Sequence, residues 1–196
     1  MLLVAGSLRR GSWNGALLDD FSQRLSFEQG DACAIDRLTP ADGRLPLFDE
    51  DLEADSAVMA QVAALHRRFA ACDGLVIASP ECNGQLSAYL KNLIDWVSRL
   101  MQADATFANP FLDRPVLLCS ATTGTSGGAV AIPHARAWFG HVGALAIGDA
   151  VCVAQADRAW TGDGDAFAPW LDAQIDAALQ RVHRLASQFA HASRHP

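Results

Sequence analysis

The sequence predicts an α/β fold in which a five-stranded parallel sheet, in the order 2-1-3-4-5, forms a three-layer sandwich with helices on both faces. Apolar runs of strand length alternate five times with segments of helical spacing, which is typical of a doubly wound sheet. The run at residues 73–78 is continuous rather than alternating, as expected for a strand buried on both faces. A length of 196 residues suits one domain, so we expect residues 1–196 to form a single unit.

The elements follow one another in a regular order. Short apolar runs predict strands at residues 2–6, 32–35 (the weakest run), 73–78, 115–119 and within 145–153. Apolar residues that recur every three or four positions predict helices at residues 13–25, 58–69, 86–100, 130–142 and 167–189. Residues 37–51, which include Pro40 and Pro46, are expected to be irregular. Pro133 limits the fourth helix to a late start or a kink, because proline lacks the backbone N–H.

Composition excludes several classes of protein. A net charge of −7 repels phosphate backbones, so we expect no nucleic-acid partner. No apolar stretch approaches the roughly 20 residues that span a bilayer, and the first residues lack the basic region of a signal peptide, so we expect no membrane partner. The five cysteines lie far apart without a CxxC pair, and the histidines show no metal-ligand spacing. We therefore expect a cytoplasmic protein without disulfides or a bound metal.

Ligands of a sheet in this order bind beyond the carboxyl ends of strands 1 and 3, so the loops at 7–14, 79–86 and 120–128 should meet at one rim. The first loop opens a helix, whose backbone N–H groups favour an anion together with the hydroxyls of Ser7 and Ser12. Arg9 adds a charged fork suited to phosphate. An ordinary strand-to-helix turn, capped by serine or asparagine, remains the alternative.

The other two loops carry weaker signals. Proline and glycine stiffen the turn at residues 79–85, where Asn83 offers both a donor and an acceptor. A simple turn into a helix capped by Ser87 explains that segment equally well. Residues 120–128 are rich in hydroxyls and in glycines that permit close backbone approach to a ligand.

Four patterns occur in order along the chain. They are G-S-x-R-x-x-S-x-N at residues 6–14, S-P-E-x-N at 79–83, L-K-N-x-I-D-W at 90–96, and G-x-x-G-G ending at Gly128. Together they resemble the NADPH-dependent FMN reductase family, a flavodoxin-like group that includes quinone, chromate and azo-dye reductases. The resemblance continues weakly to residues 160–164 and so covers nearly the whole chain.

The resemblance implies a flavodoxin-like fold, a bound FMN, and NADPH or NADH as electron donor. The electrons would pass to a small-molecule acceptor such as a quinone, an azo compound, chromate or free flavin. Flavin N5 would take the hydride, so no side chain is named as catalytic acid, base or nucleophile. The resemblance also implies a homodimer or a homotetramer.

The cofactor-binding residues that the resemblance implies fall on the same three loops. They are Ser7, Leu8, Arg9, Ser12, Trp13 and Asn14 around the phosphate, Pro80, Glu81, Cys82 and Asn83 along the isoalloxazine ring, and Thr122 and Gly124 in the third loop. Cys82 stands where the family usually has tyrosine.

Three other interpretations stay open. A flavodoxin-type electron carrier shares the fold and the acidity, although residues 6–14 do not match the T/S-x-T-G-x-T phosphate loop of flavodoxins. A binding module could have kept the fold and lost the cofactor. Cys82 beside a flavin suggests a redox sensor, although a free cysteine is more often a small packed residue.

Overall fold

The computed structural model describes residues 1–30, 33–159 and 169–194. Five parallel strands form one sheet in the order β2-β1-β3-β4-β5, as predicted. The strands are β1 (Leu2–Ala5), β2 (Asp36–Leu38), β3 (Leu75–Ala78), β4 (Pro115–Ala121) and β5 (Leu145–Val153). The helices are α1 (Trp13–Gln29), α2 (Ser56–Ala70), α3 (Ala88–Ala103), α4 (Ala131–His141), α5 (Ala156–Ala159) and α6 (Pro169–Arg194), with a 3₁₀ helix η2 (Glu50–Ala54).

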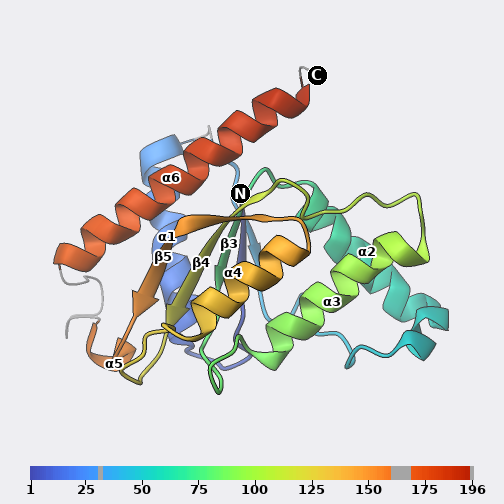
Figure 1. Cartoon of the computed structure of the whole chain (residues 1–196), viewed down its shortest axis with the longest axis horizontal. Coiled ribbons are helices and arrows are strands. Elements are labelled where there is room, and N and C mark those ends of the chain that lie inside the picture. The colour runs from blue at the N-terminus through green and yellow to red at the C-terminus, as the bar shows by residue number, and fades with distance from the viewer. Residues whose placement is uncertain (31–32, 160–168, 195–196) are drawn as a thin grey trace.

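Helices cover the sheet on both sides, which gives the predicted three layers (Figure 1). Successive residues of a strand point to opposite faces, so Leu3 packs with α1 and α6, whereas Leu2 and Val4 pack with α2, α3 and α4. All four residues of β1 and of β3 are buried. This burial explains why their sequences are continuously apolar.

The position predicted for the second strand is wrong. Residues 33–35 precede the ladder, residue 32 lies outside the described residues, and β2 pairs with β1 only from Asp36, which lies opposite Leu2. Asp36 N–H donates to Met1 O at 2.9 Å, and the Met1 ammonium donates to Ala34 O at 2.7 Å. Because β2 is an edge strand with polar side chains at its start, it lacks the apolar run that identifies an interior strand.

The fourth helix begins at Ala131, one residue after its predicted start. Pro133 lies in the first turn of α4, where a backbone N–H has no partner within the helix. The beginning of the predicted closing helix at residue 167, and the weak resemblance at residues 160–164, lie outside the described residues. None of the described helices is long and apolar enough to cross a bilayer.

Candidate functional site

The three loops predicted to meet do meet at the carboxyl edge of the sheet. They enclose a pocket of about 310 Å³. Its lining comprises Ser7, Arg9, Ser12, Trp13, Asn14, Pro80, Glu81, Ala121, Thr122 and Thr123. The arrowheads of β4 and β5 in Figure 1 point to this edge, beside α5.

The loop after β1 passes close to the start of the loop after β3. A Cβ on Gly6 would lie 2.8 Å from the Ser79 Cβ, so a larger residue would push the two loops apart. Gly6 N–H donates to Ala78 O at 2.7 Å, and the Ser87 hydroxyl donates to Gly6 O. These contacts fix where the first loop leaves the sheet.

The polar groups of the first loop remain available to an anion. Ser12 occupies the N-cap position of α1, but its side chain makes no capping hydrogen bond. Arg9 is exposed, and within the described ranges no carboxylate forms an ion pair with it. A hydroxyl, a guanidinium and a helix N-terminus therefore surround one end of the pocket, which is the arrangement that binds phosphate.

Asn14 joins two of the loops through its side chain. Its amide group donates to Ala121 O at 2.8 Å, and its Oδ1 accepts from Ala121 N–H at 2.9 Å. The residue is only 2% exposed. Asn14 thus ties the first turn of α1 to the end of β4, and a direct contact with a ligand stays a prediction.

The loop after β3 forms a tight turn. Cys82 and Gln85 exchange two backbone hydrogen bonds, at 2.8 and 3.0 Å, and the intervening Asn83 and Gly84 have φ values of 53° and 73°. Asparagine followed by glycine is the pair that tolerates such a left-handed turn. The turn uses the backbone groups of Cys82. No acceptor in the described parts of the chain takes the N–H of Glu81 or Asn83, so these donors can serve a ligand.

Not every predicted residue lines this pocket. Cys82 and Asn83 line a neighbouring pocket of about 450 Å³, between the same loop and the helices α3 and α4. Leu8 is 47% exposed, and Gly124 accepts from Gln155 N–H at 2.9 Å; neither lines the pocket.

Thr123 and Ala121 line the pocket but were missed in the sequence. The only available signal was their place in the hydroxyl-rich loop after β4.

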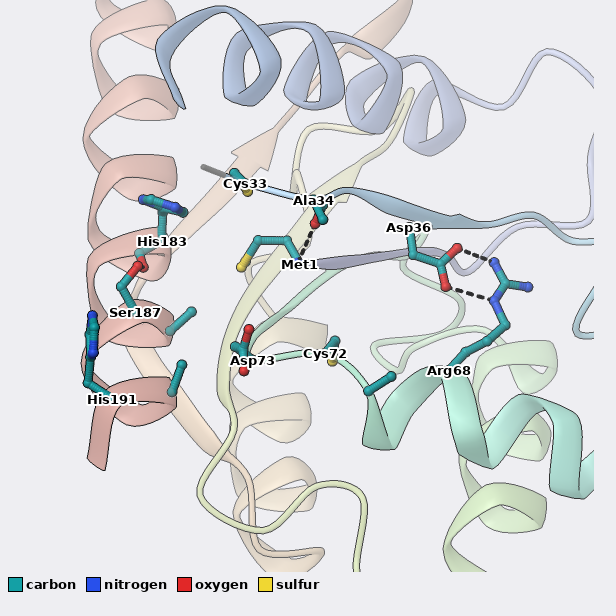
Figure 2. Close-up of a pocket in the computed structure, with 13 residues that line it drawn as sticks. Met1, Cys33, Ala34, Asp36, Arg68, Cys72, Asp73, His183, Ser187 and His191 are labelled. Atoms are coloured by element: carbon teal, nitrogen blue, oxygen red, sulfur yellow. Dashed lines mark hydrogen bonds and ion pairs between the residues drawn. The ribbon is translucent and has the colours of Figure 1, made fainter. Parts of the chain in front are cut away.

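A third pocket, of about 420 Å³, lies at the opposite, amino edge of the sheet (Figure 2). Burial raises the pKa of Cys72 to about 11, and it also raises the pKa of Cys33, so both thiols are protonated near neutral pH. Arg68 in this pocket is bonded to Asp36, as Figure 2 shows.

Across the described residues, no group of three side chains is placed to hold a metal ion.

Comparisons with known proteins agree with the family resemblance that the sequence motifs showed. A family model for NADPH-dependent FMN reductases matches residues 1–158. The quinone reductase of Escherichia coli (strain K12) is 33% identical over 136 residues, which cover 69% of this chain and 66% of that protein. An NAD(P)H-dependent FMN reductase of Pseudomonas aeruginosa is 33% identical over 140 residues, which cover 69% of this chain and 66% of that protein. The chain thus matches about two thirds of the length of these curated relatives.

A solved structure shares the fold. The flavoenzyme NAD(P)H:(acceptor) oxidoreductase FerB from Paracoccus denitrificans has a TM-score of 0.72 at 24% identity, and the match covers 93% of this chain and 96% of FerB. This likeness confirms the flavodoxin-like fold. The family match includes β1, β3 and β4 together with the three loops that form the pocket. The chain therefore belongs to the NADPH-dependent FMN reductase family, a family of oxidoreductases.

Proposed function

We propose that this protein is an NAD(P)H-dependent FMN reductase that passes electrons through bound FMN to a small-molecule acceptor. Its membership in the family supports the reaction class. The observation that carries the proposal is the pocket at the carboxyl edge, where an unpaired guanidinium and serine hydroxyls lie beside a helix N-terminus. The family match favours the reductase over a flavodoxin-type carrier, and residues 6–14 do not match the phosphate loop of such carriers.

The phosphate of FMN would bind at the first loop. Arg9 supplies the charge, the hydroxyls of Ser7 and Ser12 supply donors, and the first turn of α1 supplies backbone N–H groups. A phosphate is a fitting ligand for this end of the pocket because nothing else in the described chain neutralises Arg9.

The isoalloxazine ring would lie along the loop after β3. The free N–H groups of Glu81 in this pocket and of Asn83 beside the neighbouring pocket are donors for its polar edge, and Thr122 from the third loop also lines the pocket. Bound FMN would supply the two-electron chemistry, and the protein's part is to hold and orient it. No side chain is assigned as an acid, a base or a nucleophile.

The acceptor that we favour is a quinone, because the relatives named quinone reductase support that class. We further infer that residues 1–196 form one FMN-binding domain, which assembles as a homodimer or homotetramer in the cytoplasm. All five cysteines are free, as suits a reducing compartment. Light scattering coupled to size-exclusion chromatography measures the number of subunits.

The visible absorption spectrum of the purified protein, recorded without oxygen before and after NADPH or NADH is added, tests the function. We expect the spectrum of a bound flavin, rapid bleaching by the nicotinamide, and return of the colour when a quinone follows. A flavin that neither nicotinamide bleaches would identify an electron carrier. A colourless protein that takes up no added FMN would identify a binding module instead.

A further inference from the structure

We propose that the Glu81 carboxylate is a positioning residue: it fastens the loop after β3 to the N-terminus of α4, and this attachment sets the affinity for FMN and the surroundings of its ring. We call residues 80–85 the ring loop. The inference rests on the FMN site proposed above. Although Glu81 lines the pocket, its carboxylate bonds to the segment that opens α4.

Three hydrogen bonds join the Glu81 carboxylate to the segment that opens α4. Oε1 accepts from the Ser126 hydroxyl at 2.8 Å. Oε2 accepts from the backbone N–H of Val130 at 3.0 Å and of Ala131 at 2.9 Å. The N–H of Ala131 and then the Ser126 hydroxyl are the largest influences on the pKa of Glu81, and they hold it below its ordinary value.

The α4 helix has no cap of its own. Val130 occupies its N-cap position and makes no side-chain capping bond, and its first turn contains no acidic residue. Two other helices are capped locally, α2 by Asp55 and α3 by Ser87. A helix N-terminus leaves backbone N–H groups that need acceptors, and at α4 the ring loop provides them.

The far end of the ring loop also lies against α4. A Cβ on Gly84 would come within 3.1 Å of Val130 Cγ1, so the turn packs closely on the start of the helix. Nδ1 of His134 lies 3.0 Å from Gly84 O and 2.8 Å from Gln85 Nε2. The loop is therefore attached to α4 at both ends, and Glu81 is the attachment nearest the pocket.

In this arrangement the backbone and the side chain of Glu81 have different roles. The N–H of Glu81 has no acceptor in the described residues, while the carboxylate fixes the loop that carries it. Without the carboxylate, FMN would have to order the ring loop as it binds, and this ordering weakens binding. The phosphate end is unaffected, so we expect the affinity to fall about tenfold rather than disappear.

Glu81→Ala and Asp55→Ala form a matched pair for testing this inference. Asp55 also accepts two helix N–H bonds, from Ala57 at 2.8 Å and Val58 at 3.2 Å, but it caps α2 and lines none of the pockets at the carboxyl edge. We expect both variants of the FMN-free protein to lose stability against urea to a similar extent. Only Glu81→Ala should raise the Kd for FMN, about tenfold, and change the visible circular dichroism of the bound flavin.

Hydrogen exchange provides a measurement without flavin. In the FMN-free protein, the amides of Val130 and Ala131 should exchange faster in Glu81→Ala than in Asp55→Ala. Glu81→Gln keeps one acceptor oxygen, so its Kd should lie between those of the wild type and Glu81→Ala. If Glu81→Ala does not fold, Glu81→Gln and Ser126→Ala can be compared with Asp55→Ala by the same measurements.

Two results would overturn the inference in distinguishable ways. If the wild type binds FMN and the Glu81 and Asp55 variants have the same Kd and flavin spectrum, the positioning role is wrong and the proposed function stands. If the wild type binds no FMN, the proposed function fails, and the positioning role fails with it.

Discussion

Arg9 and Arg68 lie at opposite edges of the same sheet and differ in what surrounds them. Arg9 follows β1 at the carboxyl edge, is exposed, and has no ion-pair partner in the described ranges. Arg68 lines the pocket at the amino edge, where it bonds Asp36 at 2.6 and 2.9 Å and lies 3.4 Å from Asp42. One guanidinium can neutralise a ligand, whereas the other is already neutralised by two carboxylates.

This contrast shows that the chemistry of a lining identifies a binding site better than its size. The amino-edge pocket is the larger, at about 420 Å³ against 310 Å³. Its guanidinium is paired, the Met1 ammonium donates to Ala34 O, its thiols are protonated, and Asp73 adds a further negative charge. An anionic ligand therefore finds no unpaired guanidinium there, although it finds one in the smaller pocket.

Replacing Arg9 should have the largest effect on cofactor binding. Arg9→Ala removes a charge-assisted contact with the phosphate, so we expect the Kd for FMN to rise tenfold or more, while the stability of the FMN-free protein hardly changes. Quenching of flavin fluorescence measures the Kd. Arg10→Ala is the matched control, because Arg10 is exposed and adjacent but does not line the pocket. Equal weakening by both variants would contradict a specific phosphate contact.

Replacing Arg68 should produce the opposite pattern. Arg68→Ala leaves Asp36 and Asp42 without their cation, so we expect the free energy of unfolding to fall by about 1 kcal/mol, with little change in the Kd for FMN. The loss is modest because both carboxylates are partly exposed to solvent. Urea unfolding measures the stability. A loss of FMN affinity as large as that of Arg9→Ala would remove the distinction between the two edges.

The cysteines at the two edges of the sheet also differ, in their exposure to solvent. Cys82 is exposed on the ring loop, whereas Cys33 and Cys72 at the amino edge are only 8% and 7% exposed, and burial raises the pKa of both. We expect a thiol reagent to modify Cys82 first, and bound FMN to slow the reaction severalfold. The rate of absorbance change measures this, and Cys82→Ser should abolish the fast phase. A fast phase that FMN leaves unchanged would argue against a flavin beside Cys82.

The fold could largely be predicted because the sequence of an interior strand is apolar throughout, which indicates that both faces of the strand are buried. Leu75–Ala78 is apolar throughout since both of its faces are covered. Asp36–Leu38 has one free edge and begins with polar residues, so no local pattern distinguished it from a loop.

The meeting of the three loops follows from parallel topology alone, but the partners of their side chains do not. Glu81 bonds residues 45 to 50 positions away, and Asn14 bonds Ala121 across 107 positions. Those directions depend on how the helices pack on the sheet. They cannot be predicted from motif spacing, which is why the attachment of Glu81 to α4 was not expected.

The smallest expected effect is a dependence of stability on pH through Asp42, which lies 3.4 Å from Arg68. Burial acts to raise the pKa of Asp42, but hydrogen bonds from Thr39 and Arg68 outweigh it, so the pKa lies below its ordinary value of 3.8. A carboxyl whose pKa is lower in the folded than in the unfolded state stabilises the protein above the unfolded pKa. That contribution is lost as the pH falls through the folded pKa.

Since Asp42 is partly exposed, we expect its contribution to the free energy of unfolding to be less than about 1 kcal/mol. Urea unfolding of the wild type and Asp42→Asn should therefore differ near neutral pH and converge as the pH falls through the folded-state pKa of Asp42. A difference that persists in acid would mean that Asp42 acts through its geometry rather than its charge.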